Sequence, residues 1–402
     1  MKTVKSFRDL AINGASPAFA DPLHVGRPNI GERKALHDRL DEILDAAWLS
    51  NNGPQLQELE NRLADRLGVG YCIAMCNGTV ALEIAVRALE FSGEVIVPSY
   101  TFIATAHALH WQQIKPVFAD IDPLTHNLEP ASVNQLITPE TTGIIGVHLW
   151  GRPAPIEELQ EIADTHDLRL AFDAAHAFGC SYRGTPIGNF GECEVFSFHA
   201  TKFFNTFEGG AVATNNPELA EKMRLMRNFG FAGYDNVVHP GTNGKMTEIQ
   251  AAMGLVNLDS FDDFISTNKR HFHQYHSRLD EMSAFSLINY DDAEANNYQY
   301  LIVEMTEEAG VDRDTVVDTL NAENVLARKY FWPGCHRMMP YRELQPNAGR
   351  DLPNTTRVAE RVFSLPTGTG VDDKQIDLIC DILAVACESR AETRESACNR
   401  SD

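Results

Sequence analysis

Hydrophobic residues near the start of the chain recur at the spacing of a helix. Over residues 35–47 they fall on one face with a period near 3.6, and they are Leu36, Leu40, Ile43 and Leu44. Asparagine, glycine and proline at 51–54 interrupt this pattern. A second helical pattern follows in the string LQELENRLADRLG. We therefore expect two helices, joined by a turn, before the first strand.

Short apolar runs then alternate with helical segments as far as about residue 257. The runs are YCIAMC, EVIVP, KPVFADID, TGIIGVHLWG, LRLAFDA and EVFSFHA, and amphipathic stretches such as PIEELQEIADTH lie between them. Strands that alternate with helices are typical of a mostly parallel sheet covered on both faces. The pattern predicts an α/β fold, with a large, doubly wound domain at residues 26–257.

The two ends of the chain differ from this middle part. Residues 1–25 show no periodicity, so we expect an N-terminal arm. After residue 257 come a long polar helix, the strand YQYLIVEM and two further helical patterns, which predict a smaller α+β domain at 258–388. Residues 389–402 are polar and nearly free of apolar side chains, and we expect a disordered tail there.

Composition narrows the classes of function. The 402 residues include 34 Lys and Arg against 56 Asp and Glu, a formal charge of −22, which argues against a nucleic-acid surface. No stretch approaches the roughly 18 apolar residues of a membrane helix, and the N-terminus lacks the apolar core of a signal peptide. Eight scattered cysteines without a CxxC pair suit a reducing compartment and suggest no metal site. We expect a cytoplasmic protein.

One lysine stands where a Schiff-base lysine would be expected. Lys202 follows the strand-like run FSFHA and precedes the glycine pair of FEGG, while Asp173 ends the upstream strand LRLAFDA. Pyridoxal phosphate needs an amine to bind its aldehyde and a carboxylate to keep its ring nitrogen protonated. Lys202 and Asp173 supply this pair, so both are candidate catalytic residues. Most lysines are simply exposed surface charges, and the Asp173 partner favours the catalytic interpretation.

Other strand-to-helix turns could complete such a site, because ligands of open α/β sheets lie beyond the carboxyl ends of the strands. Gly78 and Thr79 open a helix and offer free backbone amides to a phosphate, although ordinary helix capping explains this turn equally. Ser197 is a further phosphate candidate. Phe102 could stack on a cofactor ring or pack in the core. His176 could contact an oxygen of that ring.

A series of ordered motifs carries a resemblance to a known family. They are NGT at 77–79, EVIVPSYTFIAT at 94–105, KPVFADIDP at 115–123, VHLWGRP at 147–153, DAAHAFG at 173–179, SFHATK at 197–202, EGGAV at 208–212, RNFG at 227–230 and NGKMTEIQAAMGL at 243–255. From about residue 25 to 383 the chain resembles the DegT/StrS sugar aminotransferases, which have fold type I among pyridoxal phosphate enzymes.

The resemblance implies a role for each candidate. Lys202 would form the internal aldimine, Asp173 would pair with the pyridine nitrogen, His176 would contact the ring hydroxyl, and Phe102 would stack on the ring. Gly78, Thr79 and Ser197 would bind the phosphate. Asn243 matches a residue that reaches the phosphate from the neighbouring subunit, which implies a homodimer with shared active sites.

The resemblance also implies the reaction. The family transfers an amino group from an amino acid, here expected to be L-glutamate, to a keto group on a nucleotide-linked sugar. Members with histidine in place of the lysine are dehydratases, and Lys202 favours transamination. Phe207 and the loop KYFWPGCHRMMPY at 329–341 are similar to a subgroup that acts on dTDP-linked 4-keto-6-deoxyhexoses to make 4-amino-4,6-dideoxy sugars.

The loop at 329–341 and the arginine just before it, Arg328, supply candidate substrate contacts. Arg328, Lys329, Tyr330 and His336 combine cations and aromatic rings that suit a diphosphate and a stacked base or sugar, although a solvated loop would explain them equally. Three alternatives remain: an aminotransferase for a 3-keto sugar or a cyclitol ketone, a dehydratase, and a non-catalytic regulator that binds pyridoxal phosphate.

Overall fold

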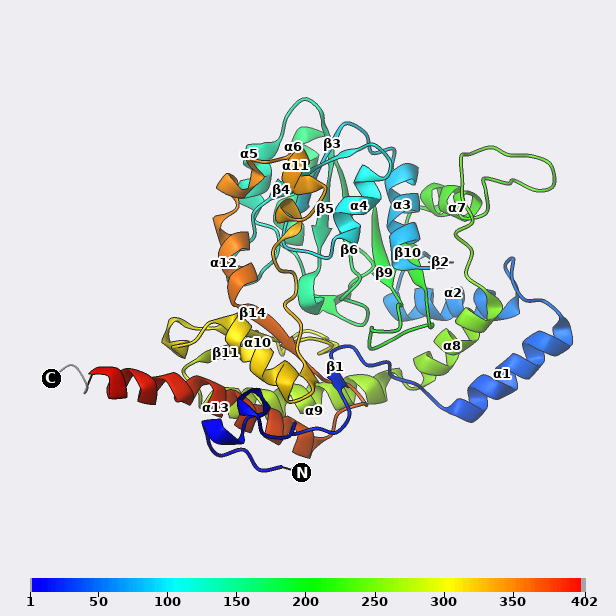
Figure 1. Ribbon diagram of the computed structural model, residues 1–402. Helices are drawn as coiled ribbons and strands as arrows, with labels where there is room; N and C mark the ends of the chain where they lie inside the picture. Colours follow the sequence, from blue (N-terminus) through cyan, green and yellow to red (C-terminus); the bar gives the residue numbers. More distant parts are fainter. Residues whose placement is uncertain (1, 399–402) are drawn as a thin grey trace.

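A seven-stranded sheet forms the centre of the computed structural model, which describes residues 2–398 and their side chains as far as residue 387 (Figure 1). The strands follow the order β2-β10-β9-β6-β5-β3-β4. β10 runs antiparallel to both of its neighbours, and the other pairs are parallel. The prediction of a mostly parallel α/β sheet is confirmed. The bounds are β2 (Tyr71–Met75), β3 (Glu94–Pro98), β4 (Lys115–Ala119), β5 (Thr141–Val147), β6 (Arg169–Asp173), β9 (Cys193–Ser197) and β10 (Gly210–Thr214).

Helices cover both faces of this sheet. On one face Leu59 of α2 and Leu159 of α6 pack in the same core as Phe196 of β9. On the other face Leu82 of α3 packs in a second core that includes Val195, the neighbour of Phe196 in the strand. Strands buried on both faces explain why the sequence shows continuous apolar runs rather than alternation. The bounds are α2 (Pro54–Leu67), α3 (Gly78–Ala88), α4 (Ala104–His110), α5 (Pro130–Leu136), α6 (Ile156–His166) and α7 (Pro217–Met226).

A second, three-stranded antiparallel sheet lies in the C-terminal part, with β12 between β11 and β14. Its residues share a separate core with α9, α10 and α13. This arrangement agrees with the expected smaller α+β domain, while the exact boundaries at 26–257 and 258–388 stay a prediction. The bounds are β11 (Phe285–Leu287), β12 (Leu301–Met305), β14 (Val362–Leu365), α9 (Phe261–Leu279), α10 (Arg313–Ala322), α11 (Tyr341–Leu344), α12 (Pro353–Arg361) and α13 (Asp373–Cys398).

Two helices extend to one side of the large sheet. α1 (Arg33–Ala46) lies beside α8 (Glu248–Asp259) at the edge of the molecule (Figure 1), and its Arg39 forms an ion pair with Glu58 of α2 at 2.9 Å. The buried carboxylate of Glu248 accepts hydrogen bonds from the amides of Gln55 and Leu56 and so attaches α8 to the start of α2. The smaller elements are β1 (Leu23–His24), β7 (Ser181–Tyr182), β8 (Thr185–Pro186), β13 (Val325–Leu326), and the 3-10 helices at Phe7–Asp9, Ala11–Asn13, Leu149–Gly151, Glu307–Ala309, Cys335–Arg337 and Ala348–Asp351.

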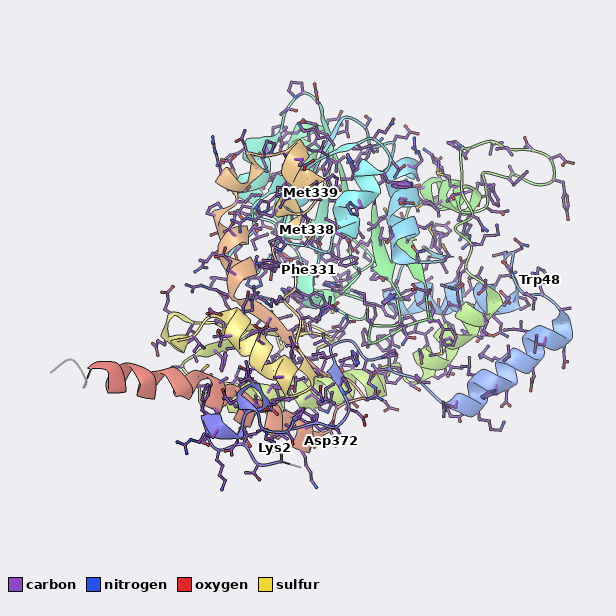
Figure 2. The ribbon with its side chains drawn as sticks, in the orientation of Figure 1. Lys2, Trp48, Phe331, Met338, Met339 and Asp372 are labelled. Carbon is purple, nitrogen blue, oxygen red and sulfur yellow. The ribbon has the colours of Figure 1, made fainter. Side chains whose placement is uncertain are left out.

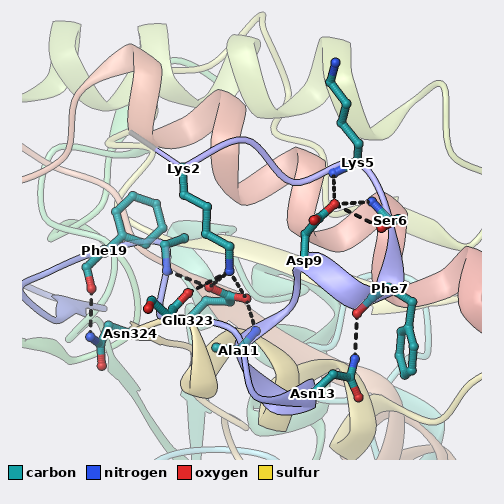
Figure 3. A network of polar contacts seen from close by, with 12 residues as sticks. Lys2, Lys5, Ser6, Phe7, Asp9, Ala11, Asn13, Phe19, Glu323 and Asn324 are labelled. Carbon is teal, nitrogen blue, oxygen red and sulfur yellow. Dashed lines mark hydrogen bonds and ion pairs between the residues drawn. The ribbon is translucent and has the colours of Figure 1, made fainter.

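The N-terminal arm packs against the smaller sheet's helices instead of extending into solvent. The buried carboxylate of Glu323 accepts hydrogen bonds from Lys2 Nζ at 3.2 Å and from the amides of Ala11 and Ala18 at 2.6 Å each (Figure 3). β1 then pairs in parallel with β13. The sequence indicated an arm, and the structure adds the carboxylate that holds it.

The C-terminal end differs from the expected tail. α13 continues to Cys398, so residues 389–398 are helical. This stretch contains alanine, glutamate and arginine, which are strong helix formers and can prolong a helix that has already begun. Residues 399–402 lie outside the described residues. Among residues 2–398, no helix is both long and apolar enough to cross a membrane.

Candidate active site

Asp173 ends β6 at the carboxyl edge of the large sheet. Its carboxylate accepts hydrogen bonds from Thr105 Oγ1 at 2.8 Å and from the Ala175 amide at 3.1 Å. Burial raises the pKa of Asp173, and these two hydrogen bonds and the nearby Lys202 oppose that rise. The two donors fix the orientation of the carboxylate. Its charge can then act on one further partner in a site that contains little water.

Lys202 lies in the loop after β9, and its amino group is close to this carboxylate. Burial lowers the pKa of Lys202 to about 8, while the charge of Asp173 acts in the opposite direction. The Nζ atom donates a hydrogen bond to the hydroxyl of Tyr300 at 3.3 Å. A lysine with a pKa this near neutrality has the neutral amine needed for a nucleophile or a base.

The start of α3 lies against Ser197. A Cβ atom placed on Gly78 would be 2.9 Å from Cβ and 3.2 Å from Oγ of Ser197, so the turn and the hydroxyl are neighbours. Asn77 caps the helix by accepting from the Val80 amide at 2.8 Å. Within the described part of the chain, the amides of Gly78 and Thr79 have no protein acceptor. The turn is therefore a capped helix end that still offers two amides to an anion.

His176 is buried beside Lys202 in its neutral form. Burial lowers its pKa well below the ordinary value, and the charge of Lys202 lowers it further. Its Nδ1 accepts a hydrogen bond from the backbone amide of Trp150 at 3.2 Å, which places the ring hydrogen on Nε2. The imidazole is thus a fixed hydrogen-bond donor through Nε2.

A group of aromatic rings surrounds His176 and Lys202. Trp150 is stacked with Phe331 at 5.1 Å between ring centres and with His176 at 5.7 Å, and the Tyr300 ring lies 4.5 Å from His176. In the view of Figure 2, Phe331 lies between the large sheet and α12, and it packs in one core with residues of both. Sequence reasoning missed Trp150, Tyr300 and Phe331 as members of the site.

Trp150 had a signal in the sequence, because it belongs to the motif VHLWGRP. Its φ of 64° is left-handed, a conformation that costs a tryptophan roughly 1–3 kcal/mol. In this conformation the Trp150 amide donates a hydrogen bond to His176, and the indole is fully buried. Phe331 likewise belongs to the loop string at 329–341, although its contact with Trp150 could not be read from that string. Tyr300, which directly precedes β12, gave no comparable signal.

Phe102 lies at the rim of the site. Its side chain is 55% exposed, and its ring is 6.2 Å from that of Phe331. The alternative that it packs in the core is therefore not what the structure shows. Stacking on a cofactor ring stays a prediction for this residue.

The four substrate candidates of the loop divide into two pairs. Tyr330 is stacked on Phe331, and the guanidinium of Arg328 lies 5.1 Å from the Tyr330 ring, so these two residues belong to the aromatic group. Lys329 forms an ion pair with Asp314 at 2.9 Å. His336 is buried, and its Nδ1 lies 2.7 Å from Ser99 Oγ. The structure therefore brings only Arg328 and Tyr330 to the Lys202 group.

Asn243 occupies an exposed position away from these rings. It forms an isolated bridge with Asn228, and the next residue, Gly244, accepts a hydrogen bond from the Cys76 amide at 2.9 Å. The segment that carries Asn243 is thus attached to the short link between β2 and the Gly78 turn, and Asn243 itself is exposed.

Comparison with known proteins identifies the family. The model of the DegT/DnrJ/EryC1/StrS aminotransferase family matches residues 31–384. The chain belongs to this family. A dTDP-4-amino-4,6-dideoxy-D-glucose transaminase of Shigella dysenteriae is 37% identical over 347 residues, which cover 86% of this chain and 94% of the relative. A GDP-perosamine synthase of Caulobacter vibrioides is 35% identical over 85% of this chain and 92% of its own length.

The solved structure of DesI in the presence of its TDP-sugar product is similar over nearly the whole chain. It superposes with a TM-score of 0.92 at 48% sequence identity and covers 99% of this chain and 100% of DesI. The sequence prediction of a fold type I sugar aminotransferase is confirmed.

As a member of the DegT/DnrJ/EryC1/StrS family, the chain is an aminotransferase that uses pyridoxal 5′-phosphate. The residues present fit this cofactor: an amine of lowered pKa, a buried carboxylate, a neutral imidazole donor and two free amides beside a hydroxyl. Among the described side chains, no group of three or more His, Cys, Asp or Glu could hold a metal ion.

Proposed function

We propose that the chain transfers the amino group of L-glutamate to the keto group of a dTDP-linked 4-keto-6-deoxyhexose, which yields a 4-amino-4,6-dideoxy sugar nucleotide. The observation that carries the proposal is the partly buried Lys202 amine beside Asp173 and neutral His176, together with the free amides of the Gly78 turn. The 48% identity to DesI, solved with a TDP-sugar product, supports the nucleotide and the sugar.

When bound, pyridoxal phosphate supplies an electron sink for the carbon that loses its proton. Asp173 would hold the ring nitrogen protonated, and His176 would donate from Nε2 to the ring oxygen. Ser197 and the amides of Gly78 and Thr79 would bind the phosphate, and Phe102 would cover one face of the ring. Asp173 would act by electrostatics, because its two hydrogen bonds hold it in place as a charge.

Lys202 would move the proton. With a pKa of about 8, roughly a tenth of its amine is neutral at pH 7, far more than for an ordinary lysine. Nζ would remove the proton from the α-carbon of the amino-acid donor. In the second half of the reaction it would return a proton to the sugar carbon that receives the amino group. One group can serve both halves because it remains beside the same reaction centre.

We propose that the sugar nucleotide enters over the aromatic group, with Arg328 and Tyr330 as contacts. The Arg328 guanidinium could pair with a phosphate, and the Tyr330 ring could stack on the sugar or base. Lys329 and His336 remain candidates, but each would have to leave its present partner, Asp314 or Ser99, to reach the substrate.

We also propose that two copies of the chain form a dimer with shared active sites. Leu44, Trp48, Leu49 and Ile249 are between 43% and 58% exposed, and they gather where the end of α1 meets the start of α8. Trp48 stands at this end of α1 in Figure 2. An apolar area of this kind is typical of an interface. Asn243 of one copy would then reach the phosphate of its neighbour. We also propose a cytoplasmic location, because cysteines such as Cys72, Cys180 and Cys193 are buried as thiols rather than paired in disulfides.

The test is a panel of ketone substrates with ¹⁵N-glutamate and the purified holoenzyme, followed by mass spectrometry. We expect ¹⁵N in the product of the dTDP-linked 4-keto sugar. Similarity to GDP-perosamine synthase favours a GDP-linked 4-keto sugar as the alternative. A preference for that substrate would replace dTDP by GDP in the proposal. Preference for a 3-keto isomer or a cyclitol ketone would refute the substrate. A bound cofactor that shows no spectral change with any donor would favour a regulator.

A further inference from the structure

The Lys202 amino group has a hydrogen-bond partner from the C-terminal part of the chain, next to the three-stranded sheet. Nζ donates to the hydroxyl of Tyr300 at 3.3 Å, and Tyr300 immediately precedes β12 of the three-stranded sheet. Lys202 itself lies in the loop after β9 of the large sheet. The hydrogen bond between Lys202 and Tyr300 therefore joins the two parts of the molecule at the reactive amine.

The Tyr300 ring is held firmly in this position. It lies 4.5 Å from the His176 ring and 5.3 Å from the Trp150 ring. Its backbone carbonyl accepts a hydrogen bond from the hydroxyl of Tyr290 at 3.0 Å. These contacts leave the hydroxyl little freedom to move away from Lys202.

Hydrogen bonds also connect the segment before Tyr300 to the loops that carry Lys202 and His176. Gln299, the residue before Tyr300, accepts a hydrogen bond through its Oε1 from the amide of Phe203 at 3.1 Å, and Phe203 directly follows Lys202. Asn297 in turn donates to the carbonyl of His176 at 2.8 Å. The segment 297–300 is thus attached to both loops that carry the candidate catalytic side chains.

We propose that Tyr300 is a positioning residue that holds the Lys202 amino group whenever that group is not covalently bound. The inference rests on the proposed role of Lys202. A lysine side chain has a long, flexible stem, and its amine loses effectiveness as a base if it moves from the reaction centre. A phenolic hydroxyl can accept from an ammonium group and can donate to a neutral amine. Tyr300 can therefore hold the amine before and after it gains a proton.

Four groups face the Lys202 amine and together determine its pKa, which should therefore change when the Tyr300 hydroxyl is removed. They are the carboxylate of Asp173, the neutral ring of His176 and the phenols of Tyr300 and Tyr330. Hydrogen bonds to charged groups are stronger than those to neutral groups. The Tyr300 hydroxyl thus favours the ammonium form, and its removal should lower the pKa of Lys202.

The experiment uses the cofactor-free protein and the variant Tyr300→Phe. Trace labelling with acetic anhydride across a range of pH, with mass spectrometry of the Lys202 peptide, measures the pKa of this amine directly. We expect the pKa to fall by about half a unit to one unit in the variant. An unchanged or higher pKa would overturn the proposal. Phenylalanine keeps the ring contacts with His176 and Trp150, so the variant should fold.

Tyr275→Phe is the matched control. It removes a buried hydroxyl that donates to the carbonyl of Pro366 at 3.1 Å, in the core that α9 shares with α13. We expect thermal destabilisation of this variant and an unchanged pKa of Lys202. Equal pKa shifts in the two variants would indicate general loosening and would overturn the positioning role.

The holoenzyme gives a second readout. In Tyr300→Phe we expect kcat to fall about tenfold with little change in KM, because a misplaced base slows proton transfer more than substrate binding. A loss confined to KM would contradict the inference. Full activity in Lys202→Ala would instead refute the proposed function, and the labelling result on Tyr300 would stand apart from that failure.

Discussion

The turn at the start of α3 allows a prediction that can be worked out from atomic distances. In Gly78→Ala the added Cβ would lie 2.9 Å from Cβ of Ser197. Ordinary carbon contacts are near 3.5–4.0 Å, so the turn and Ser197 must separate by roughly half an ångström or more. Both carry groups proposed to bind the cofactor phosphate, and they cannot both keep their positions.

The expected loss follows from the hydrogen bonds at stake. Losing one hydrogen bond to a charged phosphate costs about 1.5–3 kcal/mol, which raises the dissociation constant of pyridoxal phosphate roughly 10- to 100-fold. Alanine is well tolerated in a first helical turn, so the fold should persist. Titration of the cofactor-free variant with pyridoxal phosphate, followed by absorbance, measures the affinity, and circular dichroism checks the fold.

Gly70→Ala provides the control at the other end of β2. A Cβ at this position meets its nearest neighbour, Asn215 Oδ1, at 3.6 Å, an ordinary contact distance. We expect an unchanged cofactor affinity in this variant. If Gly78→Ala bound the cofactor as tightly as the wild type while Ser197 kept its place, the assignment of the phosphate to this turn would be refuted.

The remaining predictions concern the two catalytic candidates and the dimer. Lys202→Ala should abolish turnover while noncovalent cofactor binding persists, and near-normal rates would remove Lys202 from the mechanism. Asp173→Asn should reduce single-turnover rates about 10²- to 10³-fold with little loss of thermal stability; unchanged rates would exclude Asp173. Inactive Asn243→Asp and Lys202→Ala chains should regain partial activity when mixed, since a hybrid dimer has one intact site, and confirmed hybrids without activity would contradict shared sites. The pKa of Lys202 is about 8 in the folded protein and about 10.4 in the unfolded chain. The free energy of unfolding of the cofactor-free protein, relative to that of Lys202→Met, should therefore increase as pH rises from about 8 to about 10.4. Chemical denaturation at several pH values measures this difference, and a decrease over that range would refute the lowered pKa.

The parts of the site at strand ends could be predicted from the sequence, because the carboxyl ends of parallel strands meet at one edge. Asp173, Ser197 and Lys202 follow apolar runs that are easily recognised, and Gly78 opens a helix with a clear apolar face. For these residues, local pattern and position in the sheet agree.

The aromatic group could not be predicted in the same way. Tyr300 and Phe331 reach the site from segments far along the chain, and only tertiary packing decides which way their rings turn. Cations and rings close together in the loop suggested four substrate contacts, yet Lys329 has Asp314 on α10 as a partner and His336 has Ser99. Sequence proximity in an irregular loop does not determine side-chain direction.

The N-terminal arm has a consequence for the order in which the chain folds. The arm is made before the large sheet, but its anchor Glu323 and the strand β13 that pairs with β1 follow about three hundred residues later. All strands of the large sheet lie between them and can pair before this anchor exists. During synthesis the arm must therefore stay without its native contacts, with apolar residues such as Leu10 and Phe19 uncovered. A segment that is made before every strand of the large sheet can thus reach its native place only after all of them have been made.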